Sequence, residues 1–75
     1  MTLDEFVARF AEEFDETPAE VFNPETKYRE LEEWGSLVAL SIISMVDEEM
    51  DKMLTGTELR EAGTIRNLYN LLQAK

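Results

Sequence analysis

The sequence predicts an all-α fold: one domain over residues 1–75, with three main helices, a short third helix and a long connection between the first two. Apolar residues recur every three to four positions in three separate runs, which is the period of an amphipathic helix. No stretch alternates apolar and polar residues as a half-buried strand does. With 75 residues, 44% of them hydrophobic, the chain can build one small core but not two domains.

The first helix is expected over residues 3–14. Thr2 followed by Glu5 has the spacing of a capping box, in which each side chain bonds to the other residue's backbone N–H. The apolar residues that follow share one helical face: Leu3, Phe6, Val7, Phe10 and Phe14. The opposite face carries Asp4, Glu12 and Glu13, and solvation is its expected role.

Residues 15–35 are expected to form a long connection, because helical periodicity fades and Pro18 and Pro24 interrupt the segment. A single helical turn is expected near Pro18–Val21, where the proline follows a threonine and precedes an acidic residue. Four apolar residues are expected to hold the connection against the core: Val21, Phe22, Tyr28 and Leu31. A loop of this length either argues against the assignment or indicates a functional segment.

The second helix is expected over residues 36–50, where the helical pattern is clearest. Its core face is predicted to carry Ala39, Ile42, Ile43, Val46 and Met50, at spacings of three and four. The opposite stripe is polar and acidic except for its first member: Leu37, Ser41, Ser44, Glu48 and Asp51. An exposed Leu37 is either an ordinary surface leucine or part of a partner contact.

Two further helices are expected near the C-terminal end. Thr55 and Glu58 have capping-box spacing and predict a short helix through Glu61, which Gly63 then interrupts. A last helix is expected from Thr64 to about Gln73. Its apolar stripe consists of Ile65, Leu68, Tyr69 and Leu72.

Composition excludes several classes of function. A net charge of −10 and only seven basic residues disfavour binding to nucleic acid and to anionic membranes, so basic proteins are the expected partners. The chain has no cysteine and no histidine, which excludes a disulfide, a zinc–thiolate site and Ser–His hydrolysis within the chain. No apolar run is long enough to cross a bilayer. A cytoplasmic location is expected, since the sequence also does not begin with a basic region followed by an apolar one. A monomer is expected because like charges repel.

Ser36 lies where the polar connection ends and the apolar helix begins. A hydroxyl in the first helical turn lies near unpaired backbone N–H groups and the positive end of the helix dipole, so a phosphate carried on it would be stabilised. This favours an attachment point over a catalyst. The alternative is that the hydroxyl is only a helix cap, bonded to a backbone N–H such as that of Ala39.

Other chemistry fits the sequence less well. Four acidic residues match positions of a calcium loop, but Lys52 stands where that loop needs glycine: Asp47, Glu49, Asp51 and Glu58. No metal site is therefore expected. A serine activated by Lys27 or Lys52 is conceivable, but neither spacing predicts contact with Ser36. A small helical domain also has little volume for a catalytic cleft, so no catalytic residue is assigned and the chain is not expected to be an enzyme.

Three short sequences and the order of the segments resemble the acyl carrier proteins over nearly the whole chain. The sequences are Thr26-Lys27-Tyr28-Arg29-Glu30-Leu31, Gly35-Ser36-Leu37 and Asp47-Glu48-Glu49-Met50. The resemblance implies a four-helix, acyl-carrier-like bundle forming a single acyl carrier domain. It also implies that Ser36 carries 4′-phosphopantetheine, derived from coenzyme A, whose thiol holds an acyl or aminoacyl group as a thioester.

The resemblance further implies the partners. These are a phosphopantetheinyl transferase and acyl-transferring or condensing enzymes with basic docking patches, in fatty acid, polyketide or related biosynthesis. The recognition face predicted around the attachment serine and along the second helix comprises Gly35, Leu37, Ser41, Ser44, Asp47, Glu48 and Asp51. An acyl chain on the arm is expected to enter between the helices.

One position departs from the family pattern. The family has an aspartate directly before the attachment serine, and Gly35 stands there in this chain. As a helix N-cap, glycine is only a few tenths of a kcal/mol worse than the preferred residues, so the fold is expected to tolerate it. Recognition by the transferase is the property affected. The alternative function is therefore an unmodified adaptor of the same fold that binds basic proteins through the acidic second helix.

Overall fold

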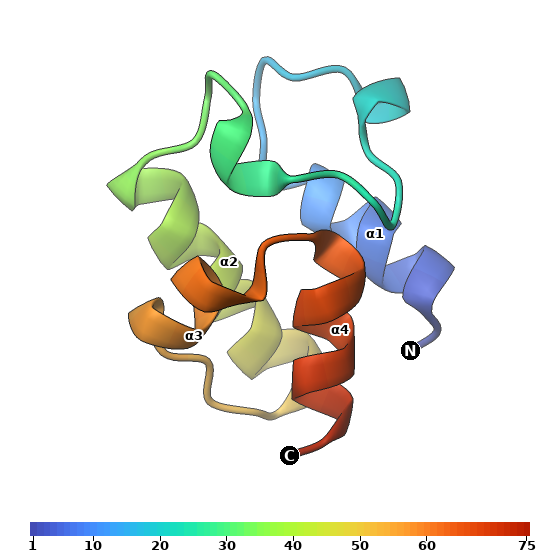
Figure 1. Cartoon of the computed structure of the whole chain (residues 1–75), viewed down its shortest axis with the longest axis vertical. Helices are drawn as coiled ribbons and strands as arrows, with labels where there is room; N and C mark the ends of the chain where they lie inside the picture. Colours follow the sequence, from blue (N-terminus) through green and yellow to red (C-terminus); the bar gives the residue numbers. More distant parts are fainter.

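Four α-helices and two short 3-10 turns make up the chain in the computed structural model, which describes residues 1–75 (Figure 1). They follow the order α1 (Leu3–Ala11), η1 (Ala19–Val21), η2 (Tyr28–Glu30), α2 (Ser36–Met50), α3 (Gly56–Ala62) and α4 (Ile65–Gln73). No strand is present. The predicted all-α bundle, with a short third helix and a long connection before α2, is confirmed.

Threonine side chains cap the start of three helices, at the positions that the sequence predicts. Thr2 and Glu5 form a capping box at α1, and Thr55 and Glu58 form another at α3. Thr64 accepts a hydrogen bond from the Asn67 N–H and caps α4. Each cap satisfies a backbone donor that has no partner inside its helix.

The first helix ends at Ala11 and is therefore shorter than the predicted range 3–14. Beyond it, the N–H groups of residues 12–14 bond to carbonyls three positions back and form tighter turns. The next three N–H groups, those of residues 15–17, donate to the carboxylate of Glu33, so they are not available to continue the helix. Phe14 is nevertheless buried, as predicted.

All fifteen buried residues are hydrophobic, and they come from every α-helix, from the connection before α2 and from the loop after it: Phe6, Val7, Phe10, Phe14, Phe22, Tyr28, Ile42, Met45, Val46, Leu54, Leu59, Ala62, Ile65, Leu68 and Leu72. Phe22 and Tyr28 hold the connection to the core as predicted, and Leu31 packs against it. The prediction for Val21 is wrong. That side chain is 40% exposed, because it lies in the η1 turn, which buries none of its residues.

The second helix has the predicted bounds, Ser36–Met50. Ile42 and Val46 are buried, and the remaining predicted core residues, Ala39, Ile43 and Met50, are half-buried against them. Met45 is also buried, although the predicted stripe omits it. The contact face of α2 is therefore centred between the 42/46 row and Met45. No helix, α2 included, has the length and apolar character needed to span a bilayer.

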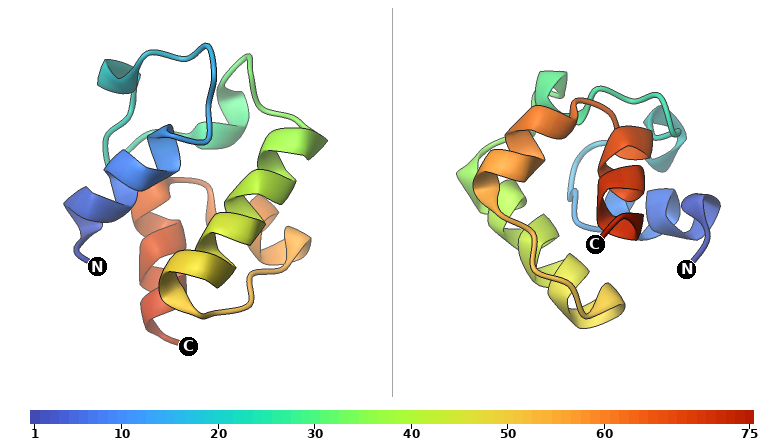
Figure 2. Two further views of the ribbon diagram at one scale, coloured as in Figure 1. Left: turned by 180° about the vertical axis from the view of Figure 1, so that it is seen from behind. Right: turned by 60° about the horizontal axis from the view of Figure 1, so that its bottom comes forward.

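The connection between α1 and α2 lies over one end of the bundle, as both views of Figure 2 and the view of Figure 1 show. Backbone N–H groups at the start of α4 bond to it: Ile65 to the Thr26 carbonyl at 3.2 Å and Arg66 to the Pro24 carbonyl at 2.8 Å. The buried Tyr28 hydroxyl donates to the carbonyl of Leu59 in α3. These bonds fix the segment that leads into α2.

Candidate functional site

The start of α2 presents Ser36 to solvent. Gly35 is the N-cap, with an extended backbone, and Ser36 is the first helical residue. The Ser36 side chain is exposed, and its hydroxyl makes no hydrogen bond within the chain. The Ala39 N–H bonds instead to the Gly35 carbonyl at 2.9 Å. The alternative in which the Ser36 hydroxyl caps the helix is therefore not observed.

This helix start is the only one of the four without a side-chain cap. Threonines cap α1, α3 and α4, whereas Gly35 has no side chain to offer, and no acidic residue lies in the first turn of α2. The backbone N–H groups of Ser36, Leu37 and Val38 have no acceptor in the chain. Unpaired donors and the positive end of the helix dipole favour an anion at this position.

Two residues directly before Gly35 hold the turn that positions Ser36. The carboxylate of Glu33 accepts hydrogen bonds from the N–H groups of Asp15 and Thr17 at 2.7 and 2.9 Å, and from the Thr17 hydroxyl at 2.7 Å. The Thr17 hydroxyl and these N–H groups lower the pKa of Glu33. Trp34 stacks against Phe14, with ring centroids 6.4 Å apart. Ser36 is therefore exposed but attached to an anchored segment.

A hollow of about 320 Å³ adjoins Ser36, between the start of α2 and α3. Its walls come from both helices and from the turn before α2: Trp34, Gly35, Ser36, Ala39, Gly56, Leu59 and Arg60. Of these residues, only Gly35 and Ser36 belong to the set predicted from the sequence. Arg60 was missed, because nothing in the spacing of α3 indicates that it faces the start of α2.

Most of the predicted recognition face on α2 comes together in a second hollow, of about 270 Å³, against the end of α1. It is lined by Leu37, Ser41, Ser44 and Glu48, together with Arg9, Glu13, Leu40 and Met45. Leu37 is 81% exposed and Leu40 60% exposed. These two leucines form an apolar patch bordered by carboxylates. The Ser41 hydroxyl bonds back to the Leu37 carbonyl at 3.2 Å, so its hydrogen is already used.

The two remaining acidic members of the predicted face lie near the end of α2 and just after it. Asp47 lines a separate hollow of about 280 Å³ near the end of the helix, with Ile43, Ser44, Lys52, Met53 and Leu54. Asp51 caps the helix in a left-handed conformation, with φ of 54°. The face is therefore continuous from Leu37 to Glu48, and Asp51 closes the helix at its far end.

Sequence reasoning missed Leu40 as a surface residue. The available signal was its spacing: Leu40, Ser41 and Ser44 lie three, four and seven positions after Leu37, which places all four on one side of a helix. Met53, which is 78% exposed in the loop after α2, was missed as well. No periodicity applies to an irregular loop, so the sequence carried no comparable signal for it.

The structure does not bring the four acidic residues of the calcium alternative into one cluster, and no group of three or more potential ligands is positioned to hold a metal. Glu58 instead pairs with Lys75 at 2.8 Å and completes the α3 capping box. Neither lysine considered as a base for Ser36 lines the hollow beside it. Lys52 donates to the Leu72 carbonyl at 2.6 Å.

Comparison with known proteins identifies no relative: no protein-family model, curated protein or solved structure matches the chain.

Proposed function

We propose that the protein is an acyl carrier that is modified on Ser36 with 4′-phosphopantetheine and delivers acyl or aminoacyl groups to partner enzymes. One observation carries the proposal. An exposed hydroxyl without a hydrogen-bond partner lies at the only helix start that has no side-chain cap. The resemblance of the Gly35-Ser36-Leu37 segment and its surroundings to the acyl carrier proteins supplies the chemical identity of the group.

The residues around Ser36 fit a phosphate ester on its oxygen. The free N–H groups of the first turn of α2 can donate to phosphate oxygens, and the helix dipole favours the negative charge. No carboxylate lies in that first turn to repel it. When attached, the group would supply the thiol that a chain without cysteine lacks. The adjoining hollow between α2 and α3 offers a path for cargo beside the apolar Leu59 and Ala39.

On this proposal the chain accelerates no reaction itself and works as a cytoplasmic monomer that docks on each partner in turn. The docking surface is the exposed pair Leu37 and Leu40, bordered by Glu48 and by Glu13, which is paired with Arg9. A net charge of −10 favours partners with basic patches and speeds their encounter with the carrier. Added salt should weaken docking, because it screens exposed charges over about 8 Å at physiological ionic strength.

The direct test is intact mass after incubation with coenzyme A and a broad-specificity phosphopantetheinyl transferase. We expect the mass of one phosphopantetheine group to be added to the wild type and to Ser44→Ala, which removes an exposed hydroxyl from the same helix. The Ser36→Ala variant should gain nothing. An adduct on Ser36→Ala would assign the modification to another residue and refute the proposal for this serine.

A second candidate is an unmodified adaptor that binds basic proteins through α2. Two observations favour it: Gly35 replaces the aspartate found in the family, and the Leu37–Leu40 patch could serve a partner without any attached group. If the wild type gains no mass even with excess transferase and long incubation, the adaptor becomes the better account.

A further inference from the structure

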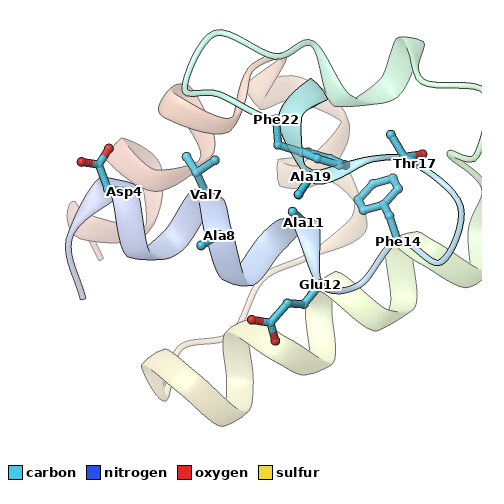
Figure 3. A pocket seen from close by; sticks show the side chains of 9 residues that line it. All are labelled: Asp4, Val7, Ala8, Ala11, Glu12, Phe14, Thr17, Ala19 and Phe22. Carbon is cyan, nitrogen blue, oxygen red and sulfur yellow. The ribbon is translucent and has the colours of Figure 1, made fainter.

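A groove on the outer side of α1 is separate from the surfaces described above. It has a volume of about 510 Å³ and lies between α1 and the segment that contains η1 (Figure 3). Nine residues line it, six of them apolar: Asp4, Val7, Ala8, Ala11, Glu12, Phe14, Thr17, Ala19 and Phe22. None of these nine residues lines the hollow beside Ser36 or the hollow on the α2 face.

The groove is formed in the free chain and does not need a ligand to open it. Phe14 and Phe22 lie together at the end of the groove near Ala11, are both buried, and contact each other with ring centroids 4.9 Å apart. Along α1 the wall is low because Ala8 and Ala11 carry only methyl groups. The opposite wall is held in place, since Thr17 is bonded to the Glu33 carboxylate by both its N–H and its hydroxyl.

The charges at the ends of the groove indicate what would occupy it. Asp4 and Glu12 lie toward opposite ends of α1, with Ala8 midway between them (Figure 3). From residue 4 to residue 12 the helical backbone rises about 12 Å along its axis, at about 1.5 Å per residue. No basic residue lines the groove. Glu12 has only a 3.7 Å contact with Arg9, whose hydrogen bond goes to Glu13, so the Glu12 carboxylate can accept another partner.

We propose that this groove is a second docking site, for a helix of a partner protein that carries one bulky apolar side chain midway between two basic residues. The apolar side chain would pack on the methyl groups of Ala8 and Ala11, beside Phe22. The basic residues, four positions before and after it, would span about 12 Å and reach Asp4 and Glu12. The inference does not depend on modification of Ser36. It would let one partner hold α1 while another engages α2.

The test uses the full chain and a synthetic helical peptide of about 18 residues, long enough to be partly helical alone. Its sequence is alanine-based, with one leucine and an arginine four positions to either side. In two control peptides, glutamine replaces the leucine or the leucine is moved next to one arginine. Binding is followed by fluorescence anisotropy of the labelled peptide, and its place on the chain by amide chemical shifts.

We expect the designed peptide to bind more tightly than either control and to shift the amides of Ala8, Ala11 and Phe22. Asp4→Asn with Glu12→Gln should weaken binding by about fivefold, as expected for the loss of two exposed ion pairs. The matched double variant is Glu32→Gln with Glu61→Gln. It removes the same charge from exposed residues outside every hollow and should weaken binding by less than about twofold.

Three results would overturn the proposal. The first is equal weakening by both double variants, which would indicate attraction by net charge alone. The second is a set of shifted amides centred on Leu37 and Leu40. The third is a designed peptide that binds no better than its controls. Circular dichroism of each variant checks that the helices are retained.

Discussion

Replacing Gly35 by aspartate tests whether the start of α2 is an open donor site. The Gly35 backbone is extended, with φ of −173°, which any residue can adopt, and a Cβ atom there would meet no other atom within 4 Å. The new carboxylate would lie in reach of the unpaired N–H groups of Leu37 and Val38. Steric strain should therefore not obscure the effect of the cap.

The gain in stability can be estimated from three contributions. A better N-cap adds a few tenths of a kcal/mol, and the loss of glycine's freedom in the unfolded chain adds roughly 0.4–1 kcal/mol. A charge at the positive end of the helix dipole adds about 0.3–1 kcal/mol, partly offset by repulsion from Glu32 and Glu33. The sum is about 1 kcal/mol. For a chain of 75 residues, that free energy raises Tm by about 6 °C.

Thermal unfolding followed by far-UV circular dichroism measures the change, with two companion variants. Gly35→Asn supplies the same cap without the charge, and Gly35→Ala restricts the unfolded chain without supplying a cap. We expect the aspartate and asparagine variants to exceed the alanine variant by about 1 kcal/mol. If alanine stabilises as much as aspartate, the first-turn N–H groups are not available to an anion, and the proposed fit of a phosphate at Ser36 fails with them.

Substitutions at three further positions test the contacts that hold the fold. Glu33→Gln should flatten the acid side of the stability curve measured by urea unfolding. The pKa of Glu33 is lowered in the native chain, so its ionised carboxylate stabilises the fold above pH 4.5, the ordinary pKa of a glutamate. This stabilisation is lost as the pH falls through the lower pKa of the native chain. Tyr28→Phe should cost about 1–2 kcal/mol of the free energy of unfolding, because the hydroxyl donates to the buried Leu59 carbonyl. Burial also raises the pKa of Tyr28 to about 12, so the wild type should lose stability above about pH 10. An equal fall in the melting temperature of the phenylalanine variant above that pH would contradict this reasoning. Thr55→Ala should cost about 1 kcal/mol at α3 and Thr55→Ser almost nothing, so equal melting temperatures for the two would exclude a capping role.

The helix boundaries could be predicted where local chemistry decides them. Thr2, Thr55 and Thr64 each begin a helix because a threonine side chain satisfies backbone donors a few residues ahead, a property of neighbouring residues alone. The end of α1 could not be predicted in the same way. It depends on Glu33, which lies sixteen to eighteen positions from the N–H groups it binds.

In the candidate site, too, the features that depend on neighbouring residues could be predicted and those that depend on tertiary packing could not. Exposure of Leu37 follows from the helical period of α2, which the sequence shows directly. The hollow beside Ser36 depends on where α3 packs. The helical period of the sequence therefore could not predict that Arg60 lines it. Met45 was missed for a related reason: the bundle surrounds α2 on more than one side, and one apolar stripe underestimates the buried width of the helix.

Trp34 is the only tryptophan of the chain and lies two positions before Ser36. The ring centroids of Trp34 and Tyr28 are 5.1 Å apart, so Tyr28 can transfer excitation energy to Trp34. The protein thus contains its own optical probe beside the candidate attachment point. Ultraviolet emission of the unlabelled chain can report, in real time, when a transferase or a cargo-bearing enzyme arrives at the start of α2.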